Sequence, residues 1–199
     1  MRLEVVQAGE EGLRAQAREL SREEILGVKT RELIEHMKET LRHAPGVGLA
    51  APQVGFPIQL AVIEDREEYH KKLTAEQLSE RQRRPVPFHV LINPHILRSD
   101  DDSLEFFEGC LSVSGYAAVV PRAKAVTVEY LDESAQTKRV EAVGWYARIL
   151  QHEIDHLAGI LYIDRMKTRT WTTLANLERY WKDVSNSEVR ARLEERPRL

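Results

Sequence analysis

The stretch 144–165, GWYARILQHEIDHLAGILYIDR, constrains the fold of this chain more than any other. It holds His152 and His156 in an H-E-x-x-H pattern with Glu153 beside the first of them. Residues four apart share one face of a helix, so both imidazoles can reach one ion, with a carboxylate next to it that can move protons. The surrounding residues of the predicted helix are mostly apolar, which indicates a buried helix. They are Ile149, Leu150, Ile154, Leu157, Ile160 and Leu161. Buried histidines need partners; a shared cation would serve both, and ordinary hydrogen-bonded core histidines are the alternative.

Composition narrows the class of protein. A length of 199 residues suits a single domain, 1–199, with a substantial core. The net charge of −3 argues against direct nucleic-acid binding, and no run approaches the roughly 20 apolar residues that span a membrane. The N-terminal residues show no apolar signal core. Cys110 is the only cysteine, so no internal disulfide can form. We therefore expect a cytoplasmic location.

The periodicity predicts an α+β fold: mixed and antiparallel sheets around the central buried H-E-x-x-H helix, with a C-terminal helix outside. The predicted strands are 3–6, 59–64, 88–97 with a break at Asn93-Pro94, 125–131 and 138–143, the last two as a hairpin. The predicted helices include 30–43 and about 172–184. We interpret the charged segment 66–87 as a surface insertion and 185–199 as a charged, frayed tail.

A catalytic metal site needs a third protein ligand, and the chain offers two candidates. Cys110 lies in a segment, Glu108–Ser112, where a glycine precedes it and frees the backbone. Glu178 is a downstream carboxylate of the kind that zincin peptidases of the gluzincin type use. A metzincin arrangement is disfavoured because Tyr162 occupies the position of its third histidine. Both Cys110 and Glu178 remain open at this point.

Three segments together carry a resemblance to a known family. GVGLAAPQ at 46–53, EGCLS at 108–112 and QHEIDHLAG at 151–159 resemble, in order and approximate spacing, the three signature motifs of peptide deformylases. The likeness runs from about Leu3 to Asp164 and is similar to the branch that includes mitochondrial-type enzymes. The chain differs from the family pattern in two places: Gly9-Glu10-Glu11 replaces the Gly-Asp-Pro that is common there, and segment 66–87 is longer than in many relatives. The resemblance gives no prediction for the residues after Trp171.

The resemblance implies a ligand set and a catalytic set. Cys110, His152 and His156 are the implied ligands of one metal ion per chain, iron(II), although the ligand types also accept Zn²⁺ or another divalent metal. Glu153 is the implied general base and acid, and the side-chain amide of Gln53 with the backbone N–H of Leu111 the implied oxyanion donors.

It also implies supporting residues. Glu108 and Arg122 correspond to positions that brace the site, which we expect to form an ion pair. Gly48 fits a loop whose backbone pairs with extended substrate, and Val47 and Ile149 are expected as walls of an apolar pocket.

Two further polar residues of the central helix have open roles. Asp155 either orients a ligand histidine or has a structural role. Arg148 either contacts substrate backbone or forms an outward salt bridge; the sequence does not decide between them.

The implied function is that of a metal-dependent hydrolase. It removes the formyl group from the N-terminal formylmethionine of newly synthesised peptides and releases formate. Its expected partners are N-formylmethionyl peptides and nascent chains at the ribosome. The alternatives are a zincin endopeptidase, which would not need Cys110, and a non-enzymatic peptide-binding or ribosome-associated protein with a relic site.

Overall fold

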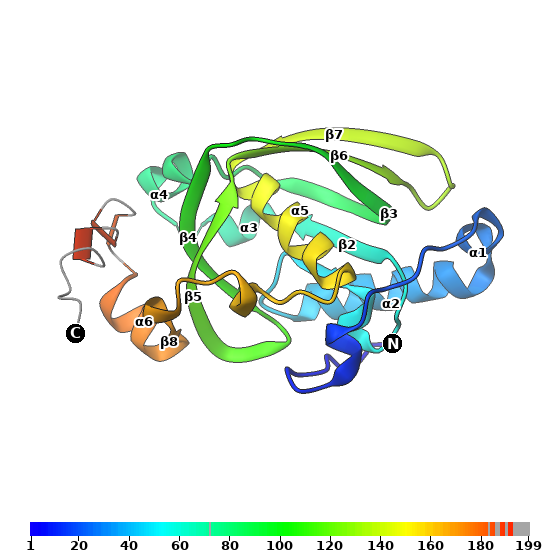
Figure 1. The fold of residues 1–199 in the computed structure, drawn as a ribbon, viewed down its shortest axis with the longest axis horizontal. Coiled ribbons are helices and arrows are strands. Elements are labelled where there is room, and N and C mark those ends of the chain that lie inside the picture. Colours follow the sequence, from blue (N-terminus) through cyan, green and yellow to red (C-terminus); the bar gives the residue numbers. More distant parts are fainter. Residues whose placement is uncertain (72, 183, 186–187, 190, 193–199) are drawn as a thin grey trace.

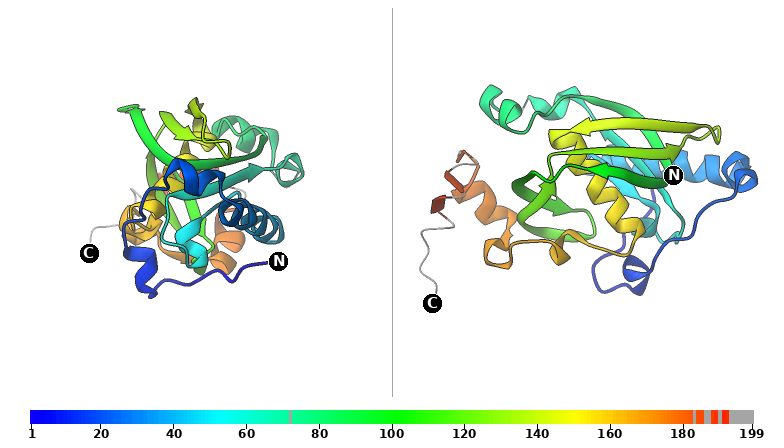
Figure 2. Two further views of the ribbon diagram at one scale, coloured as in Figure 1. Left: turned by 90° about the vertical axis from the view of Figure 1, so that its right-hand side faces the viewer. Right: turned by 45° about the horizontal axis from the view of Figure 1, so that its top comes forward.

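The protein consists of two antiparallel β-sheets that enclose one helix (Figures 1 and 2). The computed structural model describes residues 1–71, 73–182, 184–185, 188–189 and 191–192. Most of the predicted tail, 185–199, lies outside the described residues. The enclosed helix is α5, Gly144–Leu157, which carries the H-E-x-x-H pattern. The predicted α+β fold, with sheets around this helix, is therefore confirmed.

The larger sheet has five strands in the order β1-β2-β3-β6-β7. Their bounds are Gly48–Ala50, Leu60–Asp65, Val86–Ser99, Ala125–Leu131 and Thr137–Val143. Every residue of β2 is buried, because helices cover both faces of the sheet at this strand. Val62 packs in the cluster that includes α2 residues, whereas Ile63 packs in the cluster that includes α5 residues, as the alternation of side chains along a strand requires.

Helix α2, Val28–His43, lies on the face of this sheet opposite α5. Its buried stripe of Leu33, Ile34, Met37 and Leu41 is the one that the helical period predicts. The short helix α1, Arg22–Leu26, precedes it. Ser21 caps α1 in a reciprocal capping box with Glu24.

The smaller sheet has the order β4-β5-β8, with bounds Ser103–Cys110, Val113–Ala123 and Thr172–Thr173. The C-terminal helix α6 is shorter than predicted, Leu174–Tyr180, because Thr172 and Thr173 pair with β5 and Thr173 caps the helix. The part of the chain that the structure describes also contains four 3-10 turns: η1 Glu11–Arg14, η2 Ala51–Val54, η3 Tyr162–Asp164 and η4 Thr168–Thr170. Helix α6 lies outside the sheets, as expected (Figure 1).

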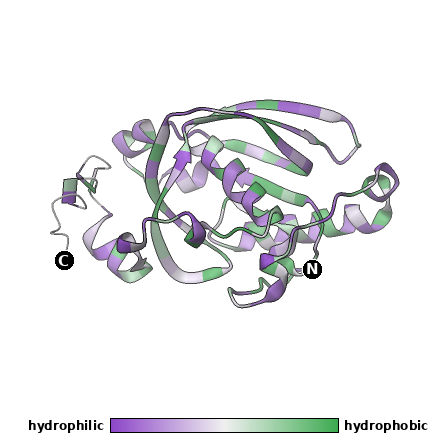
Figure 3. Ribbon diagram, viewed as in Figure 1, coloured by the Kyte–Doolittle hydropathy of each residue, from purple (hydrophilic) through white to green (hydrophobic). Residues whose placement is uncertain are grey.

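The predicted hairpin leads directly into α5. Strands β6 and β7 pair from Ala125↔Val143 to Leu131↔Thr137, and Gly144 begins the helix. Although α5 is central, hydrophilic and hydrophobic residues both appear along it (Figure 3). Four of its charged or polar side chains are buried: Arg148, Glu153, Asp155 and His156.

Other predicted elements differ in detail. Residues 3–6 form no strand, although Val6 N–H donates to the Gln53 carbonyl at 2.9 Å. The expected break at Asn93-Pro94 is a register shift within one continuous β3, with Asn93 at a φ of 48°. Segment 66–87 contains α3, Glu67–His70, and α4, Ala75–Glu80. Among the described residues, no helix has both the length and the apolarity to cross a membrane.

Candidate metal centre

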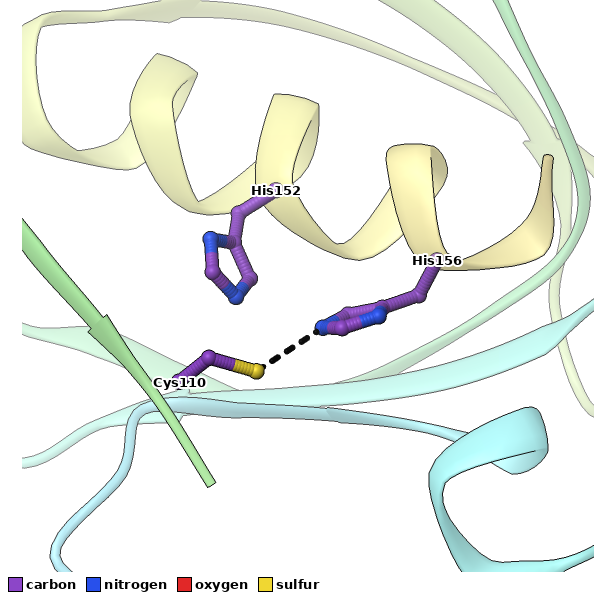
Figure 4. A group of neighbouring side chains, drawn as sticks. All are labelled: Cys110, His152 and His156. Carbon is purple, nitrogen blue, oxygen red and sulfur yellow. Dashed lines mark hydrogen bonds between the residues drawn. The ribbon is translucent and has the colours of Figure 1, made fainter. Parts of the chain in front are cut away.

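Three side chains from two elements converge between the sheets. Cys110 is the last residue of β4, and His152 and His156 lie one turn apart on α5. The ligand atoms of all three lie within 4.8 Å of one another, and Cys110 Sγ is 3.3 Å from His156 Nε2 (Figure 4). Soft thiolate and imidazole ligands in such a group suit a zinc or iron ion.

The end of β4 aims the thiol at the helix. The β4–β5 register shifts between Gly109 and Cys110, and such an irregularity redirects a side chain that a regular ladder would place elsewhere. Ser112 N–H donates to Cys110 Sγ at 3.4 Å, and Gln53 Nε2 donates to it at 3.5 Å. Both donors hold the sulfur in place beside the two imidazoles.

A buried carboxylate holds the first histidine in place. His152 Nδ1 donates to Glu108 Oε2 at 3.0 Å, which leaves Nε2 as the nitrogen available to an ion. Arg122 donates to both oxygens of Glu108, at 3.0 Å each. The expected Glu108–Arg122 ion pair is therefore present, with both side chains buried.

A second arginine binds the same carboxylate. Arg148 Nη1 donates to Glu108 Oε1 and to the Val120 carbonyl, and Nη2 donates to the Leu104 carbonyl at 2.6 Å. Arg148 is only 3% exposed, so the outward salt bridge considered from the sequence is wrong. Instead, it connects α5 to β4 and β5.

Asp155 forms ion pairs with two arginines. It accepts hydrogen bonds from Arg122 and, through both oxygens, from Arg165 at 2.6 and 2.7 Å. Neither ligand histidine contacts it in these interactions, which favours the structural alternative.

The pKa values of His152, His156, Glu108 and Glu153 are all shifted, and burial is the largest single influence on each of them. Burial alone lowers the pKa of His152, but hydrogen bonds with Cys110 and Glu108 outweigh it and hold that pKa well above the usual value. Burial, and next the neighbouring His152, holds the pKa of His156 well below its usual value. For Glu108, burial is the largest influence and raises the pKa, yet His152 and Arg122 together lower it strongly. Burial raises the pKa of Glu153 to about 7.

Glu153 and Gln53 both line the cavity beside the cluster. Glu153 is 4% exposed, and a Cβ at Gly48 would lie only 2.2 Å from its Oε1 atom. Glycine at this position therefore leaves the space that the carboxylate occupies. Besides its contact with Cys110 Sγ, the Gln53 side chain makes two hydrogen bonds: Ala50 N–H donates to its Oε1 at 2.8 Å, and its Nε2 donates to Ser112 Oγ at 3.2 Å.

The residues present fit a divalent cation. Among the described residues, no hydrogen-bond partner contacts the buried atoms His156 Nδ1 and Glu153 Oε2. A buried carboxylate oxygen without a partner is costly, and a hydrated cation held by Cys110 and the two imidazoles would offer that oxygen a water as its partner. The rival third ligand, Glu178, has a side chain that is 65% exposed and forms an ion pair with Lys182 on the surface. It therefore lies outside the cluster.

A cavity of about 350 Å³ opens onto the cluster. Its lining includes the expected residues Val47, Gly48, Gln53, Glu108, Cys110, Leu111, Ile149, His152 and Glu153. It also includes Arg148, for which the sequence allowed a substrate contact, and residues that the sequence did not assign to a pocket: Arg83, Phe107, Trp145 and Leu174. Helical spacing was the available signal for Trp145, since it precedes Ile149 by four residues. For Arg83, which comes from segment 66–87, the sequence carries no such signal.

Comparison with known proteins gives a consistent result. The family model described as polypeptide deformylase matches residues 2–171. Peptide deformylase 1A, chloroplastic, of Solanum lycopersicum is 43% identical over 175 residues, which are 88% of this chain and 63% of that protein. The mitochondrial peptide deformylase of Homo sapiens is 37% identical over 182 residues, 92% of this chain and 73% of that protein.

Solved structures agree with the sequence matches. A class I type b peptide deformylase from Acinetobacter baumannii, bound to Met-Ala-Ser, superposes with a TM-score of 0.75 at 31% identity, and the match covers 83% of this chain and 99% of the other. The chain thus spans nearly all of that structure, but less than two thirds of the tomato relative's length.

Proposed function

This chain belongs to the polypeptide deformylase family, and we propose that it removes the formyl group from the N-terminal formylmethionine of newly synthesised peptides, releasing formate. One observation carries the proposal: Cys110 Sγ and the imidazoles of His152 and His156 converge beside the buried Glu153 in an open cavity. The Met-Ala-Ser of the Acinetobacter baumannii structure has the sequence of a deformylated product.

Cys110, His152 and His156 would hold one divalent cation per chain. Deformylases are metal-dependent, and our proposal for this chain is iron(II), with Zn²⁺ or another divalent ion as the alternative after purification. When bound, such a cation lowers the pKa of its water and polarises the formyl carbonyl.

Glu153 is the proton carrier in this proposal. Its carboxylate takes the proton of the attacking water and delivers it to the leaving amine. Because burial raises the pKa of Glu153 to about 7 in the absence of a cation, its environment favours a group that both accepts and returns a proton.

Gln53 and Leu111 are the proposed oxyanion donors. The Gln53 amide is held by Ala50 and Ser112, and its second N–H, which donates to Cys110 Sγ at 3.5 Å, is the one proposed to turn to the oxyanion. Leu111 directly follows Cys110 in the β4–β5 turn and lines the cavity, which supports its backbone N–H as the second proposed donor. One preorganised donor of this kind contributes about 3–4 kcal/mol to transition-state stabilisation.

Substrate binding uses an open sheet edge. Strand β1, which begins at Gly48, is at the end of the five-strand order and, among the described residues, pairs only with β2. An extended peptide can add to its free edge as a further strand. Val47 and Ile149 then provide apolar walls for the methionine side chain.

The proposed setting follows from the substrate. Nascent chains at the ribosome present N-formylmethionine, and we infer that the chain acts on them in the cytoplasm. The relatives include chloroplastic and mitochondrial forms, so the cytoplasmic location stays a prediction. Direct nucleic-acid binding is not expected.

The test is formate release from formyl-Met-Ala-Ser by full-length protein that is purified without oxygen and whose metal content is measured. The native chain should release formate, whereas Glu153→Ala should keep its metal and lose activity by about 10²- to 10⁴-fold. Glu141→Ala, an exposed carboxylate on β7, is the matched control and should retain activity. Full activity in Glu153→Ala, or a metal-loaded native chain without formate release, would contradict the proposal.

A further inference from the structure

A short stretch of the N-terminal segment, residues 6–8, ties together the two loops that carry the proposed oxyanion donors. Val6 N–H donates to the Gln53 carbonyl at 2.9 Å, and Ala8 N–H donates to the Ser112 carbonyl at 2.7 Å. None of these three residues belongs to a helix or a strand. The loops of the candidate site therefore satisfy backbone donors that a neighbouring strand would otherwise satisfy.

Between these two anchors, the Gln7 side chain closes the turn that follows the ligand cysteine. Its Nε2 donates to the Leu111 carbonyl at 3.0 Å and to the Val5 carbonyl at 3.2 Å. Its Oε1 accepts a hydrogen bond from Ser114 N–H at 3.2 Å. Ser114 Oγ also donates to the Leu111 carbonyl, at 3.2 Å. Although Gln7 is exposed, its amide therefore joins both ends of the turn 111–114.

The peptide unit between Leu111 and Ser112 connects this contact to the metal cluster. Its carbonyl oxygen accepts from Gln7 Nε2, and its N–H donates to Cys110 Sγ at 3.4 Å. A peptide unit is planar, so a hydrogen bond that fixes its carbonyl also fixes the direction of its N–H. Hydrogen bonds in series polarise one another, so the bond at the carbonyl also makes the N–H a stronger donor to the sulfur.

We propose that Gln7 is a positioning residue that acts on the Cys110 sulfur and on the Leu111 backbone through this peptide unit. The inference rests on the proposed function and assigns a role in it to the N-terminal segment. Hydrogen bonds to a ligating sulfur stabilise its lone pairs and so tune the metal that it binds. A Leu111 backbone that is held at its carbonyl also has less freedom to turn its N–H away from the oxyanion.

Gln7→Leu removes the hydrogen bonds of the amide and keeps approximately the size of the side chain. In the cobalt(II)-loaded full chain, the thiolate-to-cobalt charge-transfer band should move to longer wavelength, because a less stabilised sulfur gives up electron density more easily. Competition with a chelator should show that cobalt(II) binds about tenfold more weakly. With formyl-Met-Ala-Ser, kcat should fall about tenfold at nearly unchanged KM, as expected for an interaction that acts on the transition state.

Gln59→Leu is the matched control. Gln59 Nε2 donates to the Ala17 carbonyl at 3.3 Å, so this side-chain amide also holds the N-terminal segment, but its hydrogen bond does not involve the turn 111–114. Urea unfolding measures how far each variant loosens the segment. Gln59→Leu should keep the native charge-transfer band, cobalt(II) affinity and kcat, which separates positioning of the site from a general loss of stability.

Gln7→Glu separates the donor from the acceptor within one side chain. At neutral pH its carboxylate still accepts from Ser114 N–H but cannot donate to the Leu111 carbonyl, so it should show the same spectral shift and loss of kcat as Gln7→Leu. A native band and native kcat in either folded Gln7 variant, or equal effects of Gln7→Leu and Gln59→Leu, overturn the inference. A metal-loaded native chain that releases no formate would instead overturn the proposed function.

Discussion

Glu108→Gln tests the brace on which the metal cluster depends. The substitution keeps the size of the side chain and removes its charge. In the native protein the Glu108 carboxylate is 6% exposed and accepts hydrogen bonds from Arg122, Arg148 and His152 Nδ1. The glutamine amide can accept from one side only, so one guanidinium or the imidazole N–H loses its acceptor.

The expected magnitude follows from these contacts. A guanidinium and a carboxylate about 4 Å apart attract each other by about 4 kcal/mol at an effective dielectric of 20. Two arginines contact Glu108, but Arg122 retains Asp155, and the amide oxygen recovers part of one interaction. Removal of one partner from a buried pair costs about 3–5 kcal/mol, which for a chain of this size lowers Tm on the order of 10 °C. Metal affinity should fall about 10- to 100-fold, since His152 loses the group that orients it.

Thermal and urea unfolding measure the first effect, and competition with a chelator measures the second. Glu64→Gln is the control, because Glu64 also accepts two hydrogen bonds from an arginine, Arg42, whose side chain is 42% exposed. That pair should contribute at most about 1 kcal/mol. If Glu108→Gln is no less stable than Glu64→Gln and binds the cation as tightly as the native chain, Glu108 does not brace the cluster.

Three other substitutions test separate parts of the structure. Gly48→Ala introduces a Cβ 2.2 Å from Glu153 Oε1 and should reduce kcat by about 100-fold or more while the metal content stays constant; native activity would show that the two do not meet in solution. Cys110→Ser should weaken metal binding in a chelator competition by at least about 100-fold; unchanged binding would favour a zincin site that does not use Cys110. Arg42→Met should lower the free energy of unfolding at pH 7 by up to about 1 kcal/mol. Because the hydrogen bond from Arg42 lowers the pKa of Glu64 from 4.5, this stabilisation is present above that pH and is lost as the pH falls through the folded-state pKa. A loss that persists undiminished in urea unfolding at pH 2 would contradict it.

Elements with a strong local signal were predicted well. The stripe of α2 and the β6–β7 hairpin each depend on residues within a few positions of one another. The misses depend on distant pairing. Residues 172–173 form a strand only because β5 lies beside them, and residues 3–6 find no strand to pair with.

In the candidate site, too, the features that depend on nearby residues could be predicted, and those that depend on distant residues could not. The spacing of His152 and His156 determines, from the sequence alone, that two imidazoles share one helix face. That Cys110 rather than Glu178 approaches them is a fact of tertiary structure, because β4 ends against α5 whereas Glu178 lies on the surface of α6. The resemblance to a family anticipated this choice, and periodicity did not.

The sequence by itself determined the helical register that pairs the two histidines, the hairpin that leads into the helix, and the chemistry that a thiol, two imidazoles and a glutamate can perform. Only the tertiary structure decided that Arg148 points inward to Glu108 and that Arg83 packs against the Trp145 ring and lines the cavity. The physical reason is that backbone preferences act over a few residues, whereas the partner of a buried charge or ring is whichever distant group the packing of the two sheets brings to it.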